Sequence, residues 1–108
     1  MMENAPDNPV LQCFRVAMTE IYGERVERVV LFGSRARGDA REDSDYDVAV
    51  FLCDMGDRMV EMNRLADPST NILYDTGEFT HAMPYRAGSY NDRREPPMHE
   101  IRAEGIDL

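Results

Sequence analysis

Residues 31–50 read LFGSRARGDAREDSDYDVAV and decide how this chain folds. The segment starts at the end of one apolar run, changes at Gly33 to a polar stretch rich in turn-forming residues, and then enters a second apolar run. Short apolar runs that are rich in β-branched residues and bounded by turn formers are typical of buried strands. We therefore expect strands at 26–32 and 45–52. The polar stretch between them forms a turn, with one helical turn starting at Ser34.

The second of these strands has two different faces. Side chains alternate along a strand, so the odd-numbered residues from 45 to 51 share one face and the even-numbered residues from 46 to 52 share the other. The odd-numbered face begins with two aspartates, whereas the even-numbered face is tyrosine followed by aliphatic residues. We therefore expect functional residues at the start of the odd-numbered face.

Helical periodicity precedes these strands. Apolar residues recur three and four positions apart from Val10 to Ile21. This spacing predicts a helix that starts at Pro9, is capped by Asn8 and stops at Gly23.

A second helical pattern follows the strands, from Asp57 to Asp75. Pro68 lies inside it and is expected to kink or break a helix. An alternative interpretation ends the helix near Ala66 and makes residues 70–74 a strand.

The remaining chain predicts a third strand at 78–85 and a short helix at 98–104, which Gly105 closes. The element order is then helix, strand, strand, helix, strand, helix. That order predicts an α/β (α+β) fold, with a small mixed sheet of about three to four strands flanked by helices. We expect one domain over residues 1–108, with residues 1–8 as a loose leader.

Charge and composition exclude several function classes. The chain of 108 residues has 21 acidic and 12 basic side chains, a formal net charge of −9, and every basic residue is an arginine. The acidic balance argues against direct binding of nucleic acid by phosphate neutralisation, and it suits metal ions or a partner with a basic face. The absence of lysine excludes a lysine Schiff base and a P-loop lysine.

Targeting signals are also absent from the sequence. No run approaches the roughly 20 apolar residues that a membrane span needs, and the first residues lack the basic and apolar regions of a signal peptide. We therefore expect a cytoplasmic protein without a membrane partner.

Cys13 and Cys53 match no metal or redox motif, and we expect both thiols to be reduced and buried.

Two features of the 31–50 segment predict phosphate chemistry. Asp45 and Asp47 lie two positions apart on a strand, so their carboxylates share a face and can share a divalent cation such as Mg²⁺. Gly33 and Ser34 lie at a strand-to-helix turn, where backbone N–H groups and a hydroxyl form a phosphate cradle. A phosphate cradle beside a two-carboxylate metal site is the equipment for phosphoryl or nucleotidyl transfer.

The pattern G-S-x10-D-x-D between two strands resembles the nucleotidyltransferase superfamily typified by DNA polymerase beta. The segments GSRARG and SDYDVAV are most similar to minimal nucleotidyltransferases (MNT), which act as antitoxins in HEPN/MNT toxin–antitoxin pairs. The resemblance is close over residues 29–52 and extends loosely to the tail, MHEIRAEGIDL.

The resemblance implies roles for the site residues. Asp45 and Asp47 would bind Mg²⁺. The superfamily often adds a third carboxylate from a later strand, which helps to hold the metal and activates the attacking hydroxyl. No clear equivalent follows here, and Glu78 and Asp75 are the candidates, of which Glu78 is the one we assign to catalysis.

The same resemblance implies how a nucleotide is held. Gly33 and Ser34 would bind the triphosphate of ATP, and Arg35 or Arg37 would assist the phosphates. The family releases pyrophosphate as it transfers a nucleoside monophosphate, and its antitoxins transfer AMP to a tyrosine of the cognate HEPN toxin. A homodimer or a hetero-oligomer with that toxin would suit so small an acidic domain.

Two alternative functions stay open. The chain could be a non-catalytic antitoxin that neutralises its HEPN partner by binding, or a nucleotidyltransferase for a small molecule of the aminoglycoside type. Enzymes of the latter type usually carry an additional helical domain, which favours the protein acceptor. For His81 and His99 we prefer surface or partner-facing roles over a His–carboxylate metal site.

Overall fold

The structure is a computed structural model that describes residues 8–108. Its helices and strands alternate along the chain, and two 3-10 turns, η2 and η3, lie between them. In chain order the elements are α1 (Pro9–Tyr22), η2 (Gly23–Arg25), β1 (Val26–Phe32), α2 (Ser34–Arg37), β2 (Tyr46–Leu52), α3 (Arg58–Thr76), β3 (Thr80–Arg86), η3 (Ser89–Asn91), α4 (Pro97–Glu104) and β4 (Ile106–Asp107).

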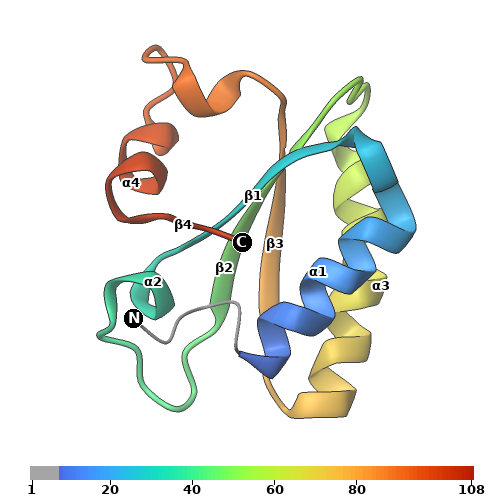
Figure 1. Ribbon diagram of the computed structural model, residues 1–108, viewed down its shortest axis with the longest axis vertical. Helices are drawn as coiled ribbons and strands as arrows, with labels where there is room; N and C mark the ends of the chain where they lie inside the picture. The colour runs from blue at the N-terminus through green and yellow to red at the C-terminus, as the bar shows by residue number, and fades with distance from the viewer. Residues whose placement is uncertain (1–7) are drawn as a thin grey trace.

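The four strands form one mixed sheet in the order β3-β2-β1-β4 (Figure 1). β1 is antiparallel to both β2 and β4, whereas β2 and β3 are parallel. Two parallel neighbours need a crossover connection, and α3 supplies it. The predicted mixed α/β fold is therefore confirmed, and β4 is a strand of two residues that hydrophobic patterning did not predict.

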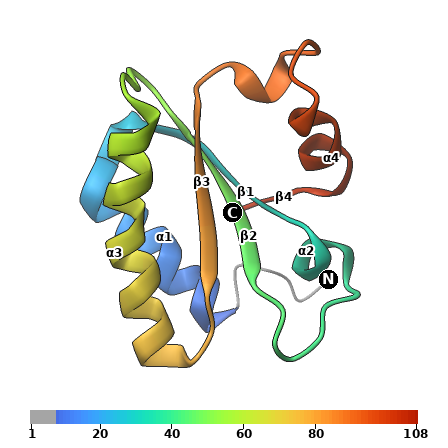
Figure 2. The same ribbon diagram turned by 180° about the vertical axis from the view of Figure 1, so that it is seen from behind.

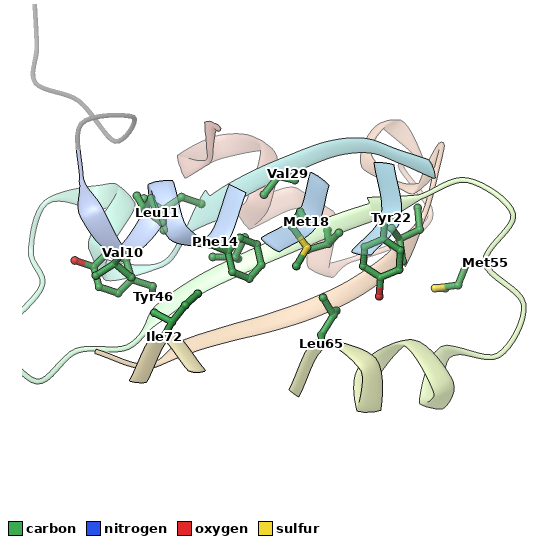
Figure 3. Close-up of a cluster of buried hydrophobic side chains, with 14 residues drawn as sticks. Val10, Leu11, Phe14, Met18, Tyr22, Val29, Tyr46, Met55, Leu65 and Ile72 are labelled. Atoms are coloured by element: carbon green, nitrogen blue, oxygen red, sulfur yellow. The ribbon is translucent and has the colours of Figure 1, made fainter. Parts of the chain in front are cut away.

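Helices cover the two faces of the sheet unequally. α1 and α3 lie side by side on one face, and α4 lies on the other, as both views show (Figures 1 and 2). The core under α1 and α3 includes Phe14 and Met18 from α1 and Leu65 and Ile72 from α3, all drawn in Figure 3. The core under α4 is smaller and consists of Val30, Ala49, Phe51, Met98 and Ile101.

The helix after β2 continues through Pro68, so the alternative strand at 70–74 is wrong. Pro68 is buried, and Leu65 and Ile72 on either side of it pack into the larger core. Burial of this apolar face offsets the hydrogen bond that a proline removes from a helix. The helix ends at Gly77, which adopts a left-handed conformation with φ 79°.

Two strand boundaries differ from the prediction. The strand expected at 45–52 begins at Tyr46, where the backbone N–H donates to the Phe79 carbonyl oxygen at 2.9 Å. The strand expected at 78–85 spans Thr80–Arg86 instead. Glu78 lies in the turn before it, where its N–H donates to Thr76 Oγ1.

Other expectations for the termini and the thiols are settled only in part. Residues 1–7 of the expected leader lie outside the described residues. Asn8 caps α1 as predicted, since its side-chain oxygen accepts from the N–H of Val10 at 2.8 Å. The expectation of buried thiols is wrong: Cys13 is exposed on α1, where it lines the groove with α3, and Cys53 is half-buried after β2. Within residues 8–108, no helix is both long enough and apolar enough to cross a membrane.

Candidate active site

Gly33 brings the end of β1 against Asp47 of β2. Phe32 pairs with Asp47 in the antiparallel ladder, and Gly33 follows with φ 79°. A Cβ atom added to Gly33 would lie 2.5 Å from Asp47 Oδ2. Only glycine allows this approach, because any side chain would collide with the carboxylate and would disfavour the positive φ.

Asp47 is a half-buried carboxylate, and His81 is its only ion-pair partner within residues 8–108. Burial raises its pKa, the neighbouring His81 acts in the opposite direction, and the negative charges of Asp45 and Glu104 raise it further. Asp45 lies just before β2 and is exposed. Charged carboxylates brought together in this way repel each other, and a bound cation relieves the repulsion.

The two aspartates fit an open magnesium site. Mg²⁺ commonly takes one or two carboxylates from the protein and fills its other positions with water and substrate phosphates. Among the described residues, no group of three or more His, Cys, Asp or Glu side chains is arranged to hold a metal ion. The donor set formed by Asp45 and Asp47 therefore suits Mg²⁺ together with a phosphorylated ligand, and it does not form a closed metal cage.

His81 lies beside Asp47 on the next strand. The parallel ladder between β2 and β3 pairs Asp47 with His81, and the imidazole Nδ1 lies 3.6 Å from Asp47 Oδ1. The His81 side chain is 53% exposed. Sequence reasoning placed His81 on a strand but missed this neighbour, because a strand pattern does not specify which strand pairs with it or in which register.

Arg35 holds the polar loop that leads to β2. Its guanidinium donates to the Ser44 carbonyl oxygen at 2.9 Å and lies 4.4 Å from the centre of the Tyr46 ring. It also pairs with Glu78 at 3.3 Å. Through these contacts, the Arg35 side chain positions the chain on both sides of Asp45.

The candidates for the third carboxylate lie in different places. Glu78 and Asp45 line the same open hollow, of about 430 Å³, together with Ser44 and Phe79. Asp75 instead lines a groove between α1 and α3. The structure thus brings Glu78, and not Asp75, to the same hollow as Asp45.

Glu104 joins the site from the end of α4 and was missed by sequence reasoning. Its Oε2 accepts from the Gly33 N–H at 3.0 Å, and both carboxylate oxygens accept from Arg37 Nη1, at 3.0 and 3.1 Å. Sequence analysis placed Glu104 at the end of a helix, and no local signal connects it to a turn 71 residues earlier.

A comparison with protein families gives one match over the centre of the chain. A family model described as "Polymerase beta, Nucleotidyltransferase" matches residues 17–84. This range includes the end of β1, the polar loop, both aspartates and β3 as far as residue 84.

Two proteins of Methanocaldococcus jannaschii are similar in sequence, and their names propose a protein adenylyltransferase activity. One is 34% identical over 83 residues, which are 77% of this chain and 77% of that protein. The other is 39% identical over 46 residues, which are 43% of this chain and 46% of that protein. The chain thus matches less than half the length of this second relative.

Solved structures share the fold at low sequence identity. A Sulfolobus solfataricus protein described as a candidate nucleotidyltransferase has a TM-score of 0.59 and 15% identity, over 89% of this chain and 72% of that one. A mutant of the toxin–antitoxin complex MntA-HpeT has a TM-score of 0.60 and 14% identity, over 87% and 68%. A toxin–antitoxin complex with AMP-PNP has a TM-score of 0.56 and 15% identity, over 86% and 68%.

Proposed function

We propose that this chain, which belongs to the polymerase beta nucleotidyltransferase family and is a nucleotidyltransferase, transfers AMP from ATP to a hydroxyl group of a partner protein. The partner in this proposal is a HEPN-domain toxin, the acceptor is a tyrosine hydroxyl, and the chain is its antitoxin. The names of the two archaeal relatives support a protein acceptor. The toxin–antitoxin complexes among the structural neighbours, one of them with AMP-PNP, support a toxin partner and an adenine nucleotide.

One observation carries the proposal: the Asp47 carboxylate lies directly against the Gly33 backbone, at one end of the two central strands of the sheet. A nucleotidyl transfer needs phosphate-binding backbone and metal-binding carboxylates side by side, because the same ion contacts both the protein and the phosphates. Gly33 and Asp47 meet this requirement through the pairing of β1 with β2.

Each site residue has a proposed role. Asp45 and Asp47 hold Mg²⁺, and the backbone at Gly33 and Ser34 binds the phosphates. When held by these two aspartates, the metal would supply positive charge to neutralise the phosphates and the leaving pyrophosphate. Burial and neighbouring carboxylates raise the pKa of Asp47, and a nearby cation would favour its charged form.

The acceptor hydroxyl must also lose a proton. We assign this step to Glu78, which lines the same hollow as Asp45. Its ion pair with Arg35 orients the carboxylate, so that it can accept the proton as the oxygen attacks the α-phosphate. Arg35 acts in this scheme as a positioning residue for Glu78 and for the loop before β2.

The decisive test is transfer to a partner. The proposed partner, a HEPN-domain toxin, is incubated with the chain, ATP and Mg²⁺, and its intact mass is measured. We expect a gain of one or more adenylate units. Asp47→Asn should lower the rate by about 10²–10³-fold, the range for loss of one electrostatic stabiliser of a transition state.

Asp67→Asn is the matched control, since it removes the same charge from an exposed position on α3 that lines the groove with α1. It should transfer at the normal rate. A stable complex without any gain in mass would instead indicate an antitoxin that acts by binding alone. Transfer to an aminoglycoside without a protein partner would contradict the protein acceptor.

A further inference from the structure

A carboxylate of the chain itself occupies the backbone that we assign to phosphate binding. Glu104 Oε2 accepts from the Gly33 N–H at 3.0 Å, and Arg37 donates to both oxygens of the same carboxylate. The Glu104 side chain is only 18% exposed. One acidic side chain thus engages two of the four residues that the sequence assigned to the nucleotide.

The fold, and not a chance side-chain conformation, places Glu104 there. Helix α4 is anchored by Met98 and Ile101, which are buried in the smaller core. Directly after Glu104, Gly105 passes so close to Ile101 and Val30 that a Cβ atom would collide with both. β4 then pairs with β1, so the chain on each side of Glu104 is attached to the sheet.

The contacts of Glu104 are those that a phosphate oxygen would make. Carboxylate and phosphate oxygens both accept hydrogen bonds from backbone N–H groups and pair with arginine in the same fork geometry. One N–H group cannot serve both acceptors at full strength.

We infer that Glu104 is an internal competitor for the phosphate-binding backbone, which holds the Gly33 amide and Arg37 until a polyphosphate displaces it. The inference rests on the proposed function, because it takes Gly33 to be the residue that receives the phosphates. It adds a regulatory step to that function, because a nucleotide can enter only when the Glu104 side chain at the end of α4 is released. A partner that moves α4 or β4 would thereby change the affinity of the chain for nucleotide.

The test uses the whole chain and inorganic tripolyphosphate with Mg²⁺ as the probe. Binding is followed by NMR through the Gly33 amide resonance. Glu104→Gln keeps an acceptor for the Gly33 N–H but removes the charge. The tripolyphosphate concentration at half-saturation should therefore fall about three- to ten-fold, the range for the net contribution of one hydrogen bond. Glu100→Gln, an exposed position on the same helix, is the control and should bind like the unaltered chain.

The unaltered chain gives a second measurement that needs no variant. At saturation with tripolyphosphate, the Glu104 carboxyl resonance should shift together with the Gly33 amide, because the two groups separate. The inference is overturned if the amide shifts while the carboxyl does not, if Glu104→Gln binds no more tightly than the control, or if the Gly33 amide responds in none of the chains.

These results are independent of adenylate transfer. A chain that shows the competition but transfers no AMP would contradict the proposed function and leave the inference standing. A chain that transfers AMP while Glu104→Gln binds tripolyphosphate with unchanged affinity would contradict the inference alone.

Discussion

The two faces of the sheet use the same strands for different purposes. On the face under α1 and α3, β2 contributes Val48, Val50 and Leu52, none of which has any exposed surface. On the other face, the smaller core under α4 includes Phe51, but Asp47 on the same side of the strand is half-buried and charged. Two long helices cover the first face, whereas the short α4 covers only one end of the second (Figure 1). The uncovered end is where charged groups reach both solvent and the backbone of Gly33.

Two carboxylates make the contrast sharper. Glu61 of α3 is 5% exposed, yet Tyr22 Oη donates to it at 2.9 Å, and Arg25 and Arg64 pair with it at 3.4 and 3.2 Å. Asp47 has His81 at 3.6 Å as its only ion-pair partner among the described residues, with other carboxylates nearby. A buried carboxylate whose donors are supplied is structural, whereas one surrounded by like charge is ready for a cation.

The largest effect on stability should come from the closed face. Phe14→Ala removes a ring that has no exposed surface and leaves a cavity between α1 and the sheet. We expect a loss of about 3–5 kcal/mol in the free energy of unfolding, measured by urea denaturation. Val16→Ala on the same helix is the control, because Val16 is 58% exposed and should change stability by less than about 0.5 kcal/mol. A similar loss from both variants would contradict the assignment of the main core to this face.

Neutralising the satisfied carboxylate should have a smaller effect. Glu61→Gln retains the shape but weakens the bonds from Tyr22, Arg25 and Arg64. The expected loss is about 1–3 kcal/mol, measured in the same denaturation experiment. Glu24→Gln is the exposed comparison and should be close to neutral. A gain in stability on Glu61→Gln would show that the free energy needed to desolvate these charged groups exceeds the free energy of their mutual attraction.

Neutralising Asp47 should have the smallest effect on stability of the three changes. It should raise the stability, whereas the other two changes lower it. Burial raises the pKa of Asp47, so the folded state binds its proton more tightly than the unfolded state does. The stability that this side chain contributes is therefore present below the ordinary pKa of an aspartate, about 4, and is lost as the pH rises through the folded pKa. Asp47→Asn should raise the melting temperature at pH 7, in buffer containing a chelator, and the difference should vanish near pH 3. A variant that melts below the unaltered chain at pH 7 would place Asp47 among the structural carboxylates.

Much of the fold follows from local patterns in the sequence. The apolar run before Gly33 and the alternation after Asp45 predicted β1 and β2 to within one residue. The helical spacing around Pro68 predicted α3, because burial of Leu65, Pro68 and Ile72 outweighs one missing hydrogen bond. β4 could not be predicted in this way, since two residues carry no periodicity and form a strand only by pairing with β1.

The sequence by itself determined every helix and strand of four residues or more, the family and the pair of aspartates beside a glycine turn, because these depend on residues close together in the chain. Only the tertiary structure decided what surrounds Asp47. The parallel pairing of β3 brings His81 to it across the connection through α3, and the packing of α4 brings Glu104 to Gly33 from 71 residues away. Hydrophobic patterns say which face of an element is buried but not which partner covers it, so contacts of this range depend on how the elements pack.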